Sequence, residues 1–146
     1  MRLLTIGFTQ KSADQFFDLI VNGGVDVVVD TRLHPDGQLA GFAKRQDLSY
    51  FLRRLANSDY RYMPVFAPTE GILKDYRSDR NWNGYVRRFE ALMDERRVPD
   101  TLDRHFFESN DCCLLCSEAT PDRCHRRLVA ERIARVWPDV EVVHLV

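Results

Sequence analysis

The sequence lacks a long hydrophobic run, a net charge and any internal repeat. No segment approaches the roughly 20 apolar residues of a membrane span, and no signal-peptide cleavage site follows the short apolar run at the N-terminus. Lys and Arg total 21 against 22 Asp and Glu, so the formal net charge of -1 creates no overall field that would attract nucleic acid. These absences predict a cytoplasmic protein without a membrane partner and exclude a histone-like binder.

Disorder is excluded as well, because hydrophobic residues make up 45% of the chain. The length of 146 residues predicts one domain, residues 1–146, with a core that needs no disulfide or metal. Four cysteines lie within 13 residues: Cys112, Cys113, Cys116 and Cys124. In a reduced compartment such a cluster indicates metal binding or site chemistry rather than disulfides. We expect Cys112 and Cys113 to be small core residues, because free cysteine is often buried.

Short apolar runs alternate with helical periods, which is typical of a parallel α/β sheet. The expected strands are 3–7, 25–30, 60–63, 111–116 and 140–146. The expected helices are 12–23, 46–57, 70–76, one beginning at Asn81, 99–108 and 120–137, with a long loop at 31–44. Because each parallel strand needs a helical crossover, we predict a three-layer, doubly wound, Rossmann-like and mostly parallel sheet of about five strands.

Polar residues follow several of these strands, where doubly wound sheets bind their ligands. Gly7 and Thr9 follow the first strand, and the backbone amides there could hold an anion or form only a tight turn. Asp30 and Arg32 share a face at the end of the second strand, as a binding pair or as a structural ion pair. Glu118 follows the cysteine-rich strand and is a candidate general base or nucleophile, or a loop cap.

The last helix adds further candidates. If it begins at Thr120, His125 and Arg126 lie in its first turn and straddle the face that meets the sheet. Arg123 then lies on the outer side, and Cys124 projects away from the core with a pKa lowered by the helix dipole. Cys116 lies nearest the end of its strand and is the better site cysteine. Whether Cys116 and Cys124 meet stays open.

Several short motifs resemble those of the domain of unknown function 488 family, TIGxS, DVR and LCxE…CHR, along most of the chain. The matching segments are Thr5-Ile6-Gly7-Phe8-Thr9, Asp30-Thr31-Arg32, Leu115-Cys116-Ser117-Glu118 and Cys124-His125-Arg126, supported by Gly41-Phe42-Ala43-Lys44 and Ala67-Pro68-Thr69. Phe8-Thr9 replaces the family's histidine-serine, and Pro35-Asp36-Gly37 replaces its Pro-x-Ser pattern. The resemblance implies a small α/β domain and points to the site residues, but it names no reaction.

The first hypothesis is an enzyme that acts on a small anionic, nucleotide-like or phosphorylated molecule, by hydrolysis or glycosyl transfer. Its catalytic candidates are Asp30, Glu118, Cys116 and His125. Its substrate-binding candidates are Gly7, Thr9, Arg32 and Arg126. This hypothesis needs no cofactor, and the sequence leaves the oligomeric state open.

Three alternatives stay open. A zinc or iron module could use Cys116, Cys124 and His125, with Glu118 as a further ligand. Cys113 is a poor partner for that set, because it lies on the opposite face of the strand from Cys116. Cys116 or Cys124 could instead act as a nucleophile or a redox switch. Finally, the chain could be a nucleic-acid or protein adaptor without catalysis, although its basic residues are mostly interleaved with acidic ones.

Overall fold

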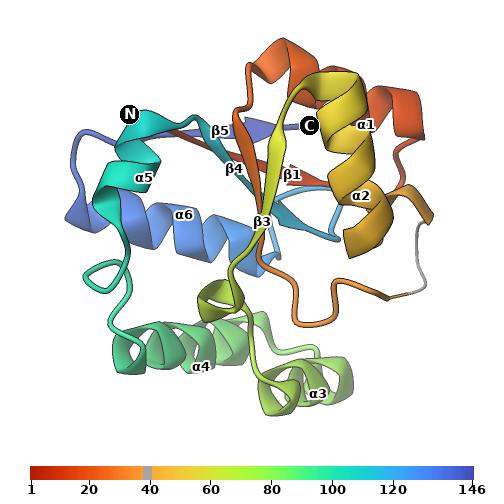
Figure 1. Ribbon diagram of the computed structural model, residues 1–146. Coiled ribbons are helices and arrows are strands. Elements are labelled where there is room, and N and C mark those ends of the chain that lie inside the picture. The colour runs from red at the N-terminus through yellow and green to blue at the C-terminus, as the bar shows by residue number, and fades with distance from the viewer. Residues whose placement is uncertain (38–40) are drawn as a thin grey trace.

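The computed structural model describes residues 1–37 and 41–146 and contains a five-stranded sheet (Figure 1). The strands are β1 (Arg2–Gly7), β2 (Val27–Asp30), β3 (Asp59–Tyr62), β4 (Cys112–Cys116) and β5 (Glu141–Leu145). They are hydrogen-bonded in the order β3-β2-β4-β1-β5, and every pairing is parallel. The predicted α/β class and strand number are therefore confirmed, with β4 inserted between β1 and β2.

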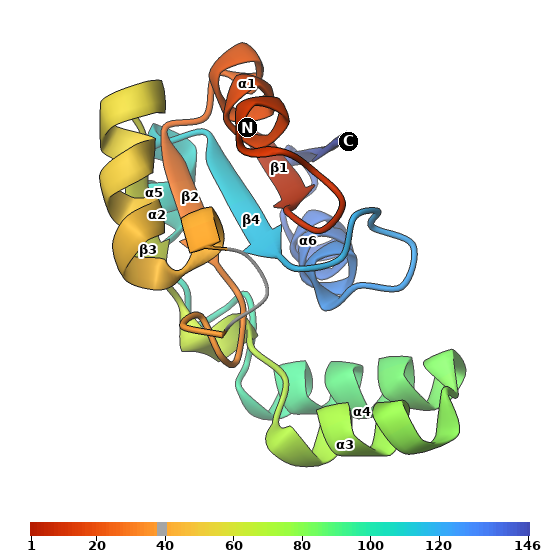
Figure 2. The same ribbon diagram turned by 90° about the vertical axis from the view of Figure 1, so that its right-hand side faces the viewer.

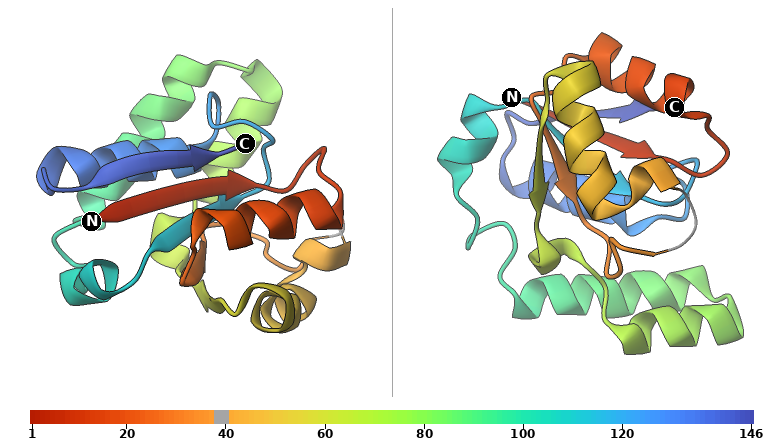
Figure 3. Two further views of the ribbon diagram at one scale, coloured as in Figure 1. Left: turned by 90° about the horizontal axis from the view of Figure 1, so that it is seen from above. Right: turned by 45° about the vertical axis from the view of Figure 1, so that its right-hand side comes forward.

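Helices cover both faces of the sheet (Figure 3). They are α1 (Ala13–Gly23), α2 (Arg45–Phe51), α3 (Glu70–Asp79), α4 (Trp82–Glu95), α5 (Arg104–Ser109) and α6 (His125–Val136). Side chains of α1 and α2 pack on one face, and side chains of α3 to α6 pack on the other. The result is the three-layer arrangement that the sequence predicts. Within the described part of the chain, none of the helices has the length and apolar character needed to cross a membrane.

Strand β4 lies in the middle of the sheet and is buried on both faces. Cys112 and Leu114 pack against the α4–α6 layer, whereas Cys113 and Leu115 pack against the α1–α2 layer. Burial raises the pKa of Cys112 to about 12, and it raises the pKa of Cys113 as well. Both cysteines are therefore core residues, as predicted, and their thiols stay protonated.

The sequence signals for the start and the end of the first helix are both confirmed. Ser12 is the N-cap of α1, and it forms the reciprocal capping box with Gln15. Gly24 ends the helix with a φ of 67°, a left-handed conformation that glycine adopts without a Cβ clash. The helix therefore buries Phe16 and Ile20 in the register that the sequence predicts.

Other boundaries differ from the expectations. The helix expected at 46–57 is α2 followed by a π-helical turn, Leu52–Ala56, and the one expected at 99–108 is only α5, which Asp103 caps. The helix expected at 70–76 extends to Asp79. Within the loop expected at 31–44, residues 41–43 form a 3₁₀ turn, while 38–40 lie outside the described residues.

The start of α6 is the correction with the largest consequence. The helix begins at His125 rather than near Thr120, and Cys124 is its N-cap in an extended conformation, with φ -137° and ψ 138°. The segment after β4 is first tied to the end of β1, because the Thr9 N–H donates to the Ser117 carbonyl at 2.9 Å. The residues that follow are needed to bring the chain back over the sheet, so the helix starts later than the Thr-Pro signal suggests.

The carboxyl ends of three neighbouring strands are level with one another. Gly7 of β1 pairs with Cys116 of β4, and Asp30 of β2 pairs with Leu115. The arrowheads of these strands point toward the side of the molecule where the α3–α4 hairpin lies (Figure 2). Residues that end these three strands are therefore brought to one edge of the sheet, beside this hairpin.

Candidate functional site

A cleft of about 580 Å³ lies at the carboxyl ends of the strands, between the sheet and the α3–α4 hairpin. Its floor includes Arg32, which follows β2, Cys116, which ends β4, and His125, which begins α6. Helices α3 and α4 contribute the opposite wall. The cleft occupies the position where doubly wound sheets bind their ligands. The structure therefore brings four of the predicted site residues together at one opening, because Glu118 lines the cleft as well.

Two cysteines and a histidine converge at the floor of this cleft. The ligand-type atoms of Cys116, Cys124 and His125 all lie within 4.8 Å of one another. All three residues are buried and line the cleft. The expectation that Cys124 projects away from the core is wrong, because this residue is the N-cap of α6 and not part of its helical turn. Cys116 and Cys124 therefore do meet.

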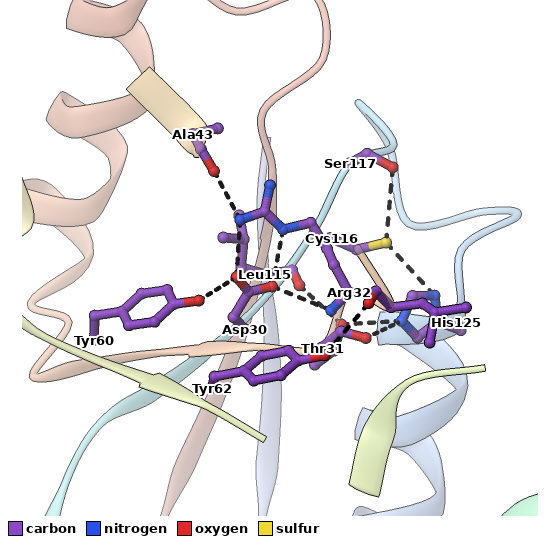
Figure 4. Close-up of polar contacts among 11 residues, drawn as sticks. Asp30, Thr31, Arg32, Ala43, Tyr60, Tyr62, Leu115, Cys116, Ser117 and His125 are labelled. Atoms are coloured by element: carbon purple, nitrogen blue, oxygen red, sulfur yellow. Dashed lines mark hydrogen bonds and ion pairs between the residues drawn. The ribbon is translucent and has the colours of Figure 1, made fainter. Parts of the chain in front are cut away.

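The imidazole of His125 is held in one orientation. Its Nε2–H donates to the Thr31 carbonyl at 2.8 Å and lies 3.0 Å from Thr31 Oγ1. The Thr31 hydroxyl itself donates to the Leu115 carbonyl at 2.8 Å, so its oxygen accepts at the histidine. With Nε2 as the donor, Nδ1 faces Cys116 Sγ at 3.5 Å (Figure 4). Thr31 therefore sets which nitrogen is presented to the sulfur.

The pKa values of these three groups move in different directions. A hydrogen bond from Cys124 and the charge of His125 hold the pKa of Cys116 well below its usual value, although burial opposes them. Burial, together with the Cys116 sulfur, raises the pKa of Cys124. Burial alone would lower the pKa of His125, but the charge of Cys116 and the hydrogen bond to it outweigh burial, so the pKa is raised. Cys116 therefore loses its proton more readily than Cys124.

Asp30 and Arg32 form a separate buried ion pair beside this cluster (Figure 4). Arg32 Nε and Nη2 donate to the two carboxylate oxygens of Asp30 at 2.9 and 2.8 Å, and Nη2 also donates to the Ala43 carbonyl. The Tyr60 hydroxyl donates to Asp30 at 2.5 Å, and burial followed by the Asp30 charge raises the pKa of Tyr60. Asp30 is fully buried and does not line the cleft, whereas Arg32 does.

Gly7 allows the loop after β4 to lie against the end of β1. A Cβ on Gly7 would lie 1.6 Å from the Glu118 carbonyl oxygen, so only glycine fits this approach. The same carbonyl accepts a 2.7 Å hydrogen bond from Arg126 Nη1. Glu118 is therefore fixed through its backbone, while its exposed side chain lines the cleft.

Arg126 and Thr9 do not line the cleft. The Arg126 guanidinium is fully buried beneath the loop, and its Nε contacts Thr5 Oγ1 at 3.4 Å. The Thr5 hydroxyl in turn bonds His144 Nδ1 at 2.6 Å. Burial and the Arg126 charge lower the pKa of His144, which keeps its ring neutral. Thr9 is exposed and borders a separate shallow hollow with Lys11.

Sequence reasoning missed the opposite wall of the cleft. Arg77 of α3 and Arg80, the residue after α3, line it. Arg123, which the expected helix start had placed on the outer side, also lines the cleft, from the loop between β4 and α6. Tyr76 and Trp82 add aromatic surface to the same wall. The run from residue 76 to 82 holds two aromatic residues and two arginines, but their relation to the strand ends depends on how the hairpin folds over the sheet. That relation is tertiary and leaves no local signal.

The fold and the cleft define a doubly wound α/β protein with a buried Cys-Cys-His cluster at the carboxyl ends of its strands. The chain belongs to the family described as domain of unknown function DUF488, whose model matches residues 12–133. The match includes Asp30-Thr31-Arg32 and Cys124-His125-Arg126, whereas residues 5–9 precede it. Searches of curated proteins and of solved structures found no match. The resemblance expected from the motifs is thereby confirmed.

Proposed function

We propose that this protein is an enzyme that binds a phosphorylated, nucleotide-like small molecule in the strand-end cleft. The observation that carries the proposal is the charge of the cleft wall. Arg77, Arg80 and Arg123 line it, and within residues 1–37 and 41–146 none of them has an ion-pair partner. Glu118 is the one acidic residue of the described lining.

Guanidinium groups suit a phosphate, because their planar fork donates two parallel hydrogen bonds to its oxygens. The whole chain has a formal net charge of only -1, so the excess of arginine in the cleft is local. A local cationic cleft attracts a small anion without giving the protein a general affinity for polyanions. This distribution favours a small phosphorylated ligand over an extended nucleic acid.

The aromatic side chains beside the arginines support a ligand with a flat ring. Trp82 and Tyr85 stack with ring centroids 5.0 Å apart and planes 12° apart, and Tyr76 meets Trp82 edge-on at 5.8 Å. Tyr76 and Trp82 are only partly buried, so their rings contribute surface to the cleft. Any nucleobase can stack on such a surface, because every base has a flat π face. The combination of phosphate-binding and ring-binding groups supports a nucleotide-like substrate.

The groups suited to react lie at the floor. The Glu118 carboxylate can accept or donate a proton, and the Cys116–His125 pair offers a nucleophile or a metal ligand set. Asp30 acts through Arg32 and is a positioning residue, as is Arg126, which holds the Glu118 backbone. Hydrolysis or glycosyl transfer at the end of the substrate nearest Glu118 is the reaction class that we propose.

The proposal is tested by calorimetric titration with adenosine monophosphate, ribose 5-phosphate and inorganic phosphate. We expect the nucleotide to bind tightest, because it alone reaches both the arginines and the aromatic rings. The double variant Arg77→Gln/Arg80→Gln should weaken nucleotide binding by at least about tenfold, or 1.4 kcal/mol. Arg87→Gln is the matched control, because Arg87 is an exposed α4 arginine outside the cleft lining.

Equal binding by the double variant and the control would contradict the proposal. Binding to oligonucleotides but to none of the three small molecules would favour the adaptor alternative instead. For the catalytic part, Glu118→Gln should keep nucleotide binding and lose turnover of whichever phosphorylated compound the wild type converts. Full turnover by that variant would remove Glu118 from the reaction.

A further inference from the structure

We propose that Cys116, Cys124 and His125 bind a Zn²⁺ ion whose fourth coordination position opens into the cleft. The convergence of three soft or borderline donor atoms, all within 4.8 Å of one another, carries the proposal. The donors come from three different backbone settings: the last residue of β4, the N-cap of α6 and the first residue of that helix. The fold therefore assembles the set before any ion binds.

The spacing of the donors matches tetrahedral zinc. Zinc–sulfur and zinc–nitrogen bonds of about 2.3 and 2.05 Å place a sulfur and a nitrogen ligand about 3.6 Å apart at the tetrahedral angle. The observed distance between Cys116 Sγ and His125 Nδ1 is 3.5 Å. That distance is also compatible with a sulfur–imidazole hydrogen bond, so the third donor decides between the two interpretations. Cys124 Sγ lies within 4.8 Å of both of these atoms, so a third donor is close enough to share one ion with them.

The surroundings of His125 are those of a metal ligand. Histidines that bind metals through one ring nitrogen usually donate the other N–H to a carbonyl or carboxylate, which fixes the ring. Here Nε2–H donates to the Thr31 carbonyl at 2.8 Å, so that Nδ1 points its lone pair at the cysteines once it has lost its proton to a binding metal. Thr31 is fully buried, so this second contact is protected from water.

A buried cation lies behind the cluster. Arg126 is fully buried and, within the described ranges, has no carboxylate partner and an Nη2 without a hydrogen bond. Its charge acts on Cys124. An isolated buried charge is costly, whereas anionic sulfur ligands nearby would offset it. The charge of Arg126 therefore favours thiolate over thiol in the cluster, and thiolate is the form of cysteine that binds a metal.

The ligand set and its position indicate a reactive ion rather than a structural one. Structural zinc sites close with four protein ligands, while catalytic sites keep three and leave one position for water or substrate. Cys116, Cys124 and His125 all line the cleft, so the remaining position faces its interior. Sulfur ligands select zinc over magnesium or calcium. When bound, the ion would lower the pKa of a coordinated water and so supply a nucleophile beside Glu118; this role rests on the proposed function.

The site is tested on purified full-length protein without a histidine tag. We expect stoichiometric zinc by elemental analysis, and after exchange with Co²⁺ we expect thiolate-to-cobalt charge-transfer bands together with the visible bands of tetrahedral cobalt. Cys116→Ser and Cys124→Ser should each weaken metal affinity by more than about 100-fold, because losing an outer partner alone costs 10- to 100-fold. Cys113→Ser is the matched control, since Cys113 is buried in β4 on the opposite face.

The cobalt spectrum of the wild type decides the proposal even if a serine variant fails to fold. Absence of both zinc and the charge-transfer bands, with rapid alkylation of Cys116 by iodoacetamide, would overturn the site and assign Cys116 to thiolate chemistry. Adenosine monophosphate titrations of the zinc-loaded and chelator-treated protein separate the two proposals. Metal binding without nucleotide binding keeps the zinc site and overturns the proposed function, whereas nucleotide binding without metal overturns only the zinc site.

Discussion

Two buried polar clusters lie side by side at the ends of β2 and β4, and they differ in how their atoms are used (Figure 4). The backbone N–H, Nε and Nη2 of Arg32 all donate to the Asp30 carboxylate, which also accepts from the Tyr60 hydroxyl, and Nη2 donates to the Ala43 carbonyl as well. In the other cluster, Cys116, Cys124 and His125 direct their donor atoms at one another and at the cleft. The carboxylate of the first cluster is bonded within the protein and does not line the cleft, whereas all three residues of the second cluster line it.

The difference shows that burial and charge alone do not identify a functional group. Both clusters are buried, and both contain residues that the sequence indicates as site candidates at the ends of strands. What separates them is which atoms border the cleft. The Asp30 carboxylate is bonded inside the protein and does not line the cleft, so it contributes to stability and positions Arg32, while the second cluster lines the cleft and can bind an ion or react. The predictions below test that division.

The largest effect is expected from Asp30→Ala. Removing one partner of a buried ion pair leaves the other charge uncompensated, which costs about 3–5 kcal/mol. We expect this loss in the free energy of unfolding, measured by urea denaturation. Cys116→Ser, compared after chelation of metal, should cost only about 1 kcal/mol, because the buried His125 imidazole can release its proton once its sulfur partner is gone, whereas the Arg32 guanidinium stays charged. Similar losses for the two variants would break the distinction between a structural and a functional cluster.

Gly7→Ala is expected to come next. Its Cβ would meet the Glu118 carbonyl, which lies between β1 and the Arg126 guanidinium, so the loop after β4 must move. Overpacking of this kind costs about 1–3 kcal/mol. The displacement should also weaken nucleotide binding, because Glu118 and Cys116 both line the cleft. Thermal denaturation and calorimetry measure the two effects. Gly71→Ala is the control, since the nearest atom to its added Cβ is 3.8 Å away, and unchanged behaviour of both variants would contradict the role of Gly7.

Asp30 also shows how much of the site the sequence can predict. The strands, the capping box at Ser12 and the core positions of Cys112 and Cys113 follow from local patterns, and the structure confirms them. The partners of Asp30 do not, because Tyr60 and Ala43 reach it only through the tertiary fold. Sequence reasoning could therefore place Asp30 at a strand end but could not decide between a structural and a catalytic role.

The direction of Cys124 was predicted wrongly for a different reason, and the meeting of Cys116 with Cys124 was left open. The pairing of Cys116 with Cys124 depends on where α6 begins, and Thr120-Pro121 offers a convincing but wrong helix start. A shift of a few residues changes the direction of every side chain in the first turn. The same shift moved Arg123 from the outer surface into the cleft lining. Helix boundaries are weakly determined by local sequence, and two residues of this site, Cys124 and His125, lie at the boundary where α6 begins.

Thr31→Val should have a moderate effect that separates position from stability. The variant loses the hydroxyl bond to the Leu115 carbonyl and one acceptor near His125 Nε2, while the backbone carbonyl remains. We expect a loss of about 1 kcal/mol in unfolding free energy. Zinc affinity should fall by about tenfold, as for other outer partners of a ligand histidine. Thr101→Val is the control, because that hydroxyl is exposed and bonds only nearby carbonyls. A stability loss with unchanged metal affinity would make Thr31 purely structural.

The smallest effect is expected at a third charged pair, which isolates burial as the cause of the difference. His34, which lines the cleft, contacts the Glu70 carboxylate through Nε2, and the two side chains are 60% and 65% exposed. Solvent screens such a pair, so Glu70→Gln should change the unfolding free energy by less than about 1 kcal/mol. Urea denaturation measures it beside Asp30→Ala, where the paired carboxylate is fully buried. A loss as large as that of Asp30→Ala would mean that the His34–Glu70 contact fastens α3 to the sheet and that burial does not explain the contrast.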